Sequence, residues 1–265
     1  MKLTLDTISF SVIAAAAAGS AMVAITGDSA VIRSAGDPLS PRLLAMWAKA
    51  QTAGTVQLVS PFMHDTTRAI RSRNIIATPQ NIIPVGLTQP MKSQDQLSAT
   101  FAATAVAGDV ELLSVLMAYP DLGGGSEKYI SAEECSSRYE AIVTIEDTLT
   151  ATVASTYSGA RALNTVTTSL KANRDYAVLG GLVSVVAGAL SIRGQDTGNL
   201  RASIPCNPTG AQETRNFFYD LASWSGLPTI PVVNAANQSG TFIELLQDEN
   251  LVAVPFTLFL ALLKE

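Results

Sequence analysis

The second half of this 265-residue chain follows the same plan as the first half. In each half an apolar segment ending in Ile-Arg is followed by an Arg-led segment, a short Val-rich strand and a long apolar hairpin. The matching segments are residues 31–33 and 190–193, 42–54 and 215–226, 55–59 and 229–233, and 97–119 and 241–263. An internal repeat of this length predicts two similar units in tandem, and it constrains the fold more than any single motif in the chain.

Local patterns assign elements within each repeat. Ser40 and Pro41 form a helix start and Gly54 a helix stop, so we expect a helix over residues 42–52. In the second half Thr214 caps an expected helix over residues 215–223. Turn residues separate two apolar arms in two places, which predicts two hairpins. One has its arms at residues 97–106 and 110–119, and the other at residues 21–25 and 30–33.

The remaining segments are assigned from alternation and turn residues. Residues 140–149 alternate as a strand, 175–186 and 189–193 are apolar strands, and 157–168 have weak helical character. Residues 62–95 and 197–212 read as loops rich in proline and polar residues, the first with short strands. The triple glycine at 123–125 is the best linker candidate. We therefore expect a mainly β fold with one β-sandwich domain over 1–122, a linker over 123–126 and a second sandwich over 127–265, each with a short helix before its last strands.

Composition indicates a protein that buries surface against partners. Charged residues make up 15% of the chain, against about 25% in typical soluble domains, whereas hydrophobic residues make up 48%. The net charge of −5 gives no general basic field for nucleic acid. The one arginine cluster, Arg68, Arg71 and Arg73, lies near the single histidine, His64, and is the candidate for contact with a genome or a shell interior. A solvated loop, a salt bridge between subunits, and an outward-facing specialised surface over residues 62–95 are the alternatives.

The motifs of catalysis are missing from the sequence. With one histidine, no nucleophile signature, no phosphate-binding loop and no metal-ligand spacing, we expect no enzyme activity, no cofactor, no metal and no small-molecule substrate. Cys135 and Cys206 are expected to be reduced, partly buried thiols, with one bridge between them as the alternative. Residues 1–21 imitate a secretory signal, but Asp6 interrupts the pattern and favours folded structure. The apolar runs 177–190 and 251–263 are shorter than a membrane span and favour buried strands.

An all-β unit with a helix before its last three strands, repeated in tandem from residue 7 to residue 263, resembles the double jelly-roll major capsid proteins of tailless icosahedral viruses. This resemblance is architectural and rests on no diagnostic motif. It implies two jelly-roll-like domains and a structural coat protein whose homotrimers form pseudo-hexagonal capsomers of a virion shell, assembled in the host cytoplasm.

The same resemblance implies partners. These are neighbouring capsomers, vertex or minor capsid proteins, and local contacts with a genome or an inner membrane. Two alternatives remain: a tailed-phage type of capsid protein, which would need a long spine helix, and a β-rich virion accessory or carbohydrate-binding module, which would expose aromatic residues.

Overall fold

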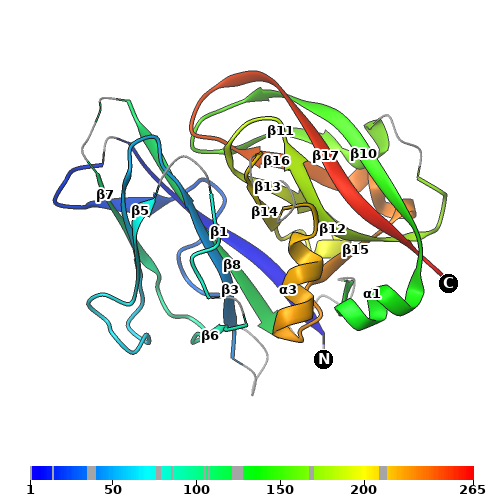
Figure 1. Cartoon of the computed structure of the whole chain (residues 1–265), viewed down its shortest axis with the longest axis horizontal. Helices are drawn as coiled ribbons and strands as arrows, with labels where there is room; N and C mark the ends of the chain where they lie inside the picture. The colour runs from blue at the N-terminus through cyan, green and yellow to red at the C-terminus, as the bar shows by residue number, and fades with distance from the viewer. Residues whose placement is uncertain are drawn as a thin grey trace.

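Eight strands from the first 120 residues form one antiparallel sheet, and nine strands from the rest of the chain form two more (Figure 1). The computed structural model describes residues 2–13, 15–34, 40–75, 79–84, 86–103, 106, 108–120, 128–166, 170–208 and 214–265, with the side chains of 74 and 151 left aside. The expected mainly β fold is confirmed. The glycine linker over 123–126 lies outside the described residues, so the domain limits stay a prediction.

Every element within the described part of the first half is a strand. The strands are β1 (Leu3–Ile13), β2 (Ser20–Ala24), β3 (Arg42–Lys49), β4 (Gly54–Val59), β5 (Ile70–Ile75), β6 (Gln89–Pro90), β7 (Ser98–Ala103) and β8 (Val110–Pro120).

Among its described residues, the second half adds the α-helices α1 and α3 and three 3-10 turns. Its elements are β9 (Tyr129–Ile130), α1 (Ala132–Arg138), β10 (Tyr139–Thr152), β11 (Tyr157–Ala162), η1 (Leu163–Thr165), β12 (Asp175–Val183), β13 (Ala187–Arg193), η2 (Gln195–Thr197), β14 (Ala202–Cys206), α3 (Phe217–Ser225), β15 (Ile230–Asn234), η3 (Ala235–Gly240), β16 (Phe242–Leu246) and β17 (Leu251–Leu263). No helix among the described residues is long and apolar enough to cross a membrane.

The eight-stranded sheet bends between β1 and β2, where only two residue pairs, Phe10 with Ala24 and Ser11 with Val23, join the strands. Its two parts therefore face each other as layer 1 (β5-β4-β7-β2) and layer 2 (β1-β8-β3-β6). Side chains such as Phe10 and Met46 from layer 2 and Leu58 and Phe101 from layer 1 share one buried apolar cluster. The first half is thus a sandwich with its own core.

The second half is also two-layered. Layer 3 is β11-β16-β13-β14, and layer 4 is β10-β17-β12-β15 extended by β9. Counted from β10, the strands of layer 4 run first, eighth, third, sixth, and those of layer 3 run second, seventh, fourth, fifth. Counted from β1, the strands of layer 2 also run first, eighth, third, sixth, and those of layer 1, starting at β2, also run second, seventh, fourth, fifth. The two halves therefore repeat one strand order over eight strands.

Layer 2 lies in the middle of the stack and is buried on both faces. Its outer face packs on layer 3, where β14 contacts β1 and β13 contacts β3 and β8. Leu5, Leu44 and Leu116 of layer 2 join the same apolar cluster as Leu190 of layer 3 and Leu258 of layer 4. All eleven residues of β8 are buried, as its almost uninterrupted apolar sequence requires. The layers are therefore stacked in the order 1, 2, 3, 4 (Figure 1).

Several predicted elements are confirmed. The helix expected over 215–223 is α3, which buries Phe217, Phe218 and Leu221. The strand expected over 140–149 is β10, with Ile145 buried on one face and Ile142 exposed on the other. The expected strands over 55–59, 175–186 and 189–193 are β4, β12 and β13, and short strands do interrupt residues 62–95.

The helix predicted over residues 42–52 is wrong, and so is the expectation of a helix in each half. Residues 42–49 form β3, which pairs with β8 and is buried on both faces from Leu43 onward. Leucine, alanine and methionine favour a helix locally. The position between two apolar layers outweighs that preference. Both described α-helices, α1 and α3, belong to the second half.

The predicted pairings and some segments also need correction. β7 and β8 follow one another but lie in different layers, and β2 pairs with β1 and β7 while Val31 makes only an isolated bridge to Gln96. Residues 157–162 are strand β11 rather than helix. The segment 197–212, read as a loop, contains β14, and the connection at 131–137 holds α1.

Candidate functional site

The contact between layers 2 and 3 carries a buried polar network, which we take as the candidate site. Arg201, immediately before β14, has a side chain only 16% exposed. Its Nη1 donates to Asp28 Oδ1 at 2.6 Å, and its Nε donates to Glu244 Oε2 at 3.1 Å. The guanidinium carbon lies 4.3 Å from the Tyr157 ring centroid, and the Arg201 carbonyl accepts from Thr7 Oγ1 at 3.0 Å. One arginine therefore joins both halves of the chain.

Hydroxyl groups extend this network along the interface. The Tyr157 hydroxyl lies 3.1 Å from Ser9 Oγ and 3.2 Å from Ser203 Oγ, and Ser9 Oγ lies 3.0 Å from Ser114 Oγ. The Ser9 backbone N–H donates to Asp28 Oδ2 at 2.7 Å. Each of these contacts satisfies a polar group that the stacking of layers removes from water.

Burial sets the electrostatics of the network. It raises the pKa of Asp28 to about 6, against the opposing effects of the Ser9 N–H and of Arg201. Burial also acts upward on the pKa of Glu244, but hydrogen bonds from Arg193 and Arg201 outweigh it and the pKa is lowered. Glu244 is thus held ionised between two arginines, whereas Asp28 titrates close to neutral pH.

A second polar contact between the halves lies around β3. The indole Nε1 of Trp47 donates to the Gly188 carbonyl at 2.7 Å, and the Trp47 ring meets Phe217 of α3 edge-on at 5.8 Å. Lys49 forms a buried ion pair with Asp248 from the turn between β16 and β17, and Gln51 Nε2 donates to Asp248 Oδ2 at 2.9 Å. Helix α3 and this turn therefore fix the second half onto layer 2.

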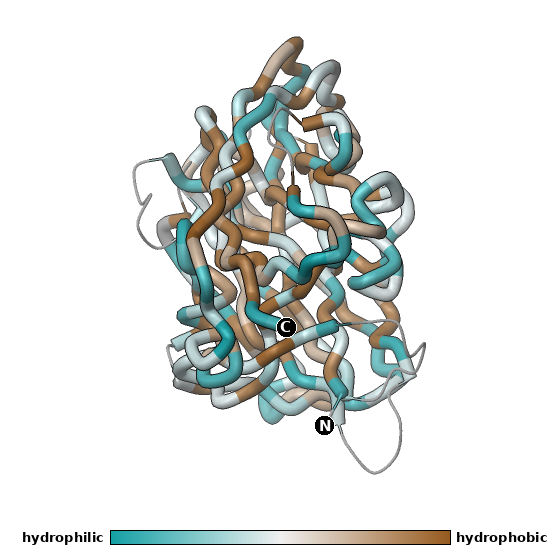
Figure 2. The backbone as a smooth tube through the Cα atoms, turned by 90° about the vertical axis from the view of Figure 1, so that its right-hand side faces the viewer, coloured by the Kyte–Doolittle hydropathy of each residue, from teal (hydrophilic) through white to brown (hydrophobic). Residues whose placement is uncertain are grey.

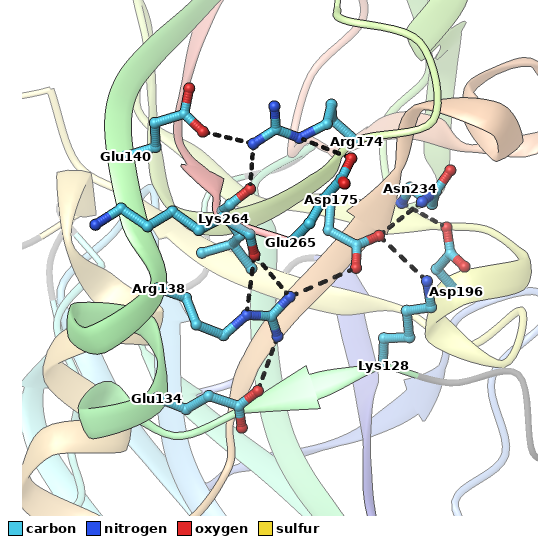
Figure 3. Close-up of polar contacts among 11 residues, drawn as sticks. Lys128, Glu134, Arg138, Glu140, Arg174, Asp175, Asp196, Asn234, Lys264 and Glu265 are labelled. Carbon is cyan, nitrogen blue, oxygen red and sulfur yellow. Dashed lines mark hydrogen bonds and ion pairs between the residues drawn. The ribbon is translucent and has the colours of Figure 1, made fainter.

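A charged cluster fastens the C-terminal end of β17 to α1, β10 and β12 (Figure 3). Arg174 Nη2 donates to Glu140 Oε2 at 2.5 Å and to the Leu263 carbonyl at 2.7 Å. Lys128 Nζ lies 3.2 Å from Asp175 Oδ1, and the hydrogen bond from Arg174 lowers the pKa of Glu140. Other members are Glu134, Arg138, Asp196, Asn234, Lys264 and Glu265. Each of these contacts holds chain segments together.

The predicted arginine cluster lies on layer 1, far from the interface network. Arg71 and Arg73 are exposed on β5, where they pair with Gln57 and Thr55 of β4 and so share one outer face. Arg68 precedes the strand, and its backbone N–H donates to Asp65 Oδ1 at 2.9 Å. His64 is exposed in the same turn. The structure therefore brings Arg71 and Arg73 together on one face, and their contact with a genome stays a prediction.

The two cysteines are free and buried. Cys135 lies on α1 and Cys206 ends β14, and burial raises the pKa of both thiols. Among the residues that the structure describes, no group of three or more His, Cys, Asp or Glu side chains is placed to hold a metal ion.

The outer face of layer 4 is hollowed. A cavity of about 670 Å³ opens there and is lined by Glu146, Asp147, Thr148, Leu182, Val183, Ser184, Pro208, Arg215, Pro255, Phe256 and Thr257. Figure 2 views the chain from this side and shows hydrophobic and hydrophilic residues interleaved along it. The face thus combines apolar strand residues with charged ones.

Local sequence patterns do not predict the interface network. They place Asp28 in a turn and Arg201 in a loop. The one available signal was Glu244, a charged residue within the apolar sequence Phe242–Leu246, because a charge in a buried strand needs a partner.

No protein-family model and no curated protein matches the sequence. Solved structures do match. One is a chain in the atomic structure of Sulfolobus turreted icosahedral virus, with 9% identity, a TM-score of 0.23, and coverage of 99% of this chain and 91% of that one. Another is the major capsid protein P2 of bacteriophage PM2, with 6% identity, a TM-score of 0.22, and coverage of 100% and 99%.

A third match is the PBSX exported protein XepA, with 9% identity, a TM-score of 0.19, and coverage of 98% and 86%. With TM-scores of 0.19–0.23, these matches carry no argument about the fold or the function of this chain. At these identities none of them assigns a role to a residue of this chain.

Proposed function

We propose that the chain is a self-assembling viral coat protein built from two tandem jelly-roll domains. A jelly roll is a sandwich of eight strands in two sheets, and it is the fold of many viral capsid domains. In it the first, eighth, third and sixth strands form one sheet and the second, seventh, fourth and fifth form the other. The observation that carries the proposal is that strand order in this chain follows this rule twice, from β1 to β8 and from β10 to β17.

The position of α3 supports the same proposal. It lies between the fifth and sixth strands of the second unit, β14 and β15, and packs on β12, β15 and α1. With the domains placed at 1–122 and 127–265, each roll has all eight of its strands within its own domain. The linker over 123–126 then joins the last strand of one roll to the start of the other.

Two rolls in one chain suit a trimeric capsomer. Three copies present six similar domains, which can tile a hexagonal lattice, and a head-to-tail contact closes into a ring when the rotation fits. The low charge content of 15% suits large lateral interfaces. In this proposal the protein acts in the virion shell with copies of itself, and with vertex or minor capsid proteins as further partners. It has no catalytic role.

Solution size tests the proposal. Light scattering on purified protein should give trimers of about three times the 27.7 kDa chain mass, or larger assemblies, and negative-stain microscopy should show capsomers, sheets or shells. A 27.7 kDa monomer at every concentration and ionic strength, without such particles, would overturn it. That result, together with binding to immobilised glycans, would instead support a virion accessory or carbohydrate-binding module.

A further inference from the structure

Lys49 and Asp248 form a more deeply buried ion pair than Arg201 and Asp28, and it too joins the two halves of the chain. Lys49 ends β3 in layer 2, and Asp248 lies in the turn between β16 and β17. Their side chains are 7% and 2% exposed, and Lys49 Nζ is in direct contact with Asp248 Oδ1. Two charges closed off from water lose their hydration, and their mutual attraction only partly offsets that loss. A reaction that removes both charges is therefore favoured here.

We propose that Lys49 and Asp248 join through an isopeptide bond, a covalent amide that ties the first half of the chain to the second. Both reacting groups are side chains of this protein, and the product released is water. The bond is a self-modification, so no substrate or cofactor takes part. This inference goes beyond the coat function and does not depend on it, since it concerns how the two halves are held together in one copy.

Apolar side chains surround the pair. Leu112 lies directly across from Lys49 in the register of β3 and β8 and is 1% exposed. Cys206, at the end of β14, is near enough for the charge of Lys49 to act against the burial that raises the pKa of its thiol. Leu246, two residues before Asp248, is fully buried. Such surroundings exclude water, which is the reagent that would hydrolyse the bond once it has formed.

Gln51 holds the carboxyl group in a fixed position. Its Nε2 donates to Asp248 Oδ2 at 2.9 Å, and its Oε1 accepts from the backbone N–H of Val110 at 3.0 Å. The backbone N–H of Gln51 donates to Glu111 Oε2 at 3.0 Å. The side-chain amide of Gln51 is thus anchored at its oxygen, with an N–H aimed at Oδ2 while Lys49 meets Oδ1. An amine that attacks the carbon between these two oxygens needs this arrangement.

The contacts give each atom of the reaction a role. A proton passes from the Lys49 ammonium to Asp248 Oδ1, which leaves a neutral amine and a carboxylic acid. The lone pair of Nζ attacks Cγ, and the N–H of Gln51 stabilises the negative charge that develops on Oδ2. The Cγ–Oδ1 bond then breaks, and Oδ1 leaves as water with its own proton and one from Nζ. Groups held in contact react as if at an effective concentration of about 10⁵–10⁸ M.

The other carboxylates of the site also favour the amide. Glu111, on β8, is 1% exposed, and burial raises its pKa, to which the negative charges of Asp109 and Asp248 add. Conversion of Asp248 into an amide removes one of these negative charges. Glu111 keeps the backbone N–H groups of Gln51 and Thr52 as its donors. Bond formation therefore relieves repulsion between carboxylates as well as the cost of a buried ion pair.

Mass spectrometry under denaturing conditions tests the inference. The wild type should be lighter than the mass its sequence predicts by one water, about 18 Da. K49R should have its full sequence mass, because the guanidinium keeps the positive charge and does not lose a proton to become a nucleophile. K171R is the matched control, since Lys171 is an exposed lysine whose Nζ lies 3.8 Å from Glu140 Oε1. It should keep the loss of one water.

Tryptic mapping locates the bond. Trypsin does not cleave after an acylated lysine, so residues 43–68 and 216–264 of the wild type should appear as one linked species. In K49R the segments 43–49, 50–68 and 216–264 should separate. In freshly synthesised Q51L the water should be lost at least about tenfold more slowly, because the donor to Oδ2 is gone. Q57L, on layer 1, should react at the wild-type rate, and equal rates in Q51L and Q57L would overturn the role of Gln51.

Two results would overturn the inference. One is a wild type at its full sequence mass. The other is a loss of one water with normal tryptic cleavage after Lys49, since the loss then comes from a different dehydration, such as a succinimide at an aspartate. Both results leave the coat function standing, because assembly is measured separately. A wild type that carries the bond but stays monomeric would overturn the coat function alone.

Discussion

Arg201 and Asp28 form a 2.6 Å ion pair that crosses from layer 3 to the connection after β2, between parts of the chain 173 residues apart. The side chain of Asp28 is 4% exposed and that of Arg201 is 16% exposed. A pair this well buried is weak evidence for net stability, but removing one member leaves the other charge uncompensated. It is therefore where the attachment of the two halves is most sensitive to substitution.

Arg201→Met should destabilise the protein by about 3–5 kcal/mol, because both Asp28 and Glu244 lose a buried partner. Urea unfolding followed by circular dichroism measures this change. Arg42→Met is the control, since Arg42 is exposed and donates a surface hydrogen bond to Thr88 Oγ1, and it should change stability by less than about 0.5 kcal/mol. Equal losses in the two variants would contradict the assignment of Arg201 to a buried network.

Asp28→Asn should change how stability depends on pH. The pKa of Asp28 is raised from 3.8 to about 6, so between these values the folded state holds a proton that the unfolded state has lost. The wild type therefore loses stability through this group as pH rises from about 4 to about 6, and at 1.36 kcal/mol per pKa unit the loss is about 2–3 kcal/mol.

The asparagine variant lacks this titration. Between pH 4 and pH 7 the unfolding free energy of Asp28→Asn should therefore rise relative to that of the wild type by the same about 2–3 kcal/mol. Carboxyl groups with shifted pKa values that do not interact with Asp28, such as Glu111, titrate in both proteins and cancel in the difference. A difference that stays constant with pH would show that Asp28 does not titrate in this range.

Local sequence patterns predicted the ends of each unit well. The apolar runs that became β7, β8, β16 and β17 occupy the seventh and eighth positions of both units, so this part of the repeat matches in the structure. Their pairing was not predictable in the same way. Consecutive strands usually pair in one sheet, but here the short turn at residue 108 carries the chain across the core from layer 1 to layer 2.

Burial explains the errors in element type. Most residues from Leu43 to Trp47 are leucine, alanine or methionine, which favour a helix. Nothing in the local sequence shows that apolar layers lie on both sides of them. The earlier parts of the proposed repeat also mismatch, because β4 is the fourth strand of its unit whereas β15 is the sixth. The interface network was invisible for the same reason, since Asp28 and Arg201 meet only when the two halves stack.

Trp47→Phe should destabilise the protein by about 1–3 kcal/mol. The phenyl ring keeps most of the apolar surface but has no donor, so the Gly188 carbonyl loses its 2.7 Å hydrogen bond in a buried position. Trp224→Phe is the comparison, because Trp224 is only partly buried at the end of α3, and its effect should be smaller. Thermal unfolding followed by circular dichroism avoids the change in fluorescence. A larger loss for Trp224→Phe would contradict the role given to Trp47.

Gly180→Ala should loosen helix α3 from layer 4. A Cβ at this position of β12 would collide with the backbone carbonyl oxygens of Thr214 and Arg215, the second at 2.5 Å, and a backbone cannot move aside as a flexible side chain can. Overpacking of this kind costs about 1–3 kcal/mol or more. The loss should appear in urea unfolding, together with a change in the fluorescence of Trp47, whose ring contacts Phe217 of α3.

Gly240→Ala is the matched control, because a Cβ there meets nothing within 4 Å, and it should leave both measurements unchanged. If the two alanine variants behave alike, α3 is not held by close approach to Gly180, and the packing of this helix on the sheet must depend on Phe217, Phe218 and Leu221 alone.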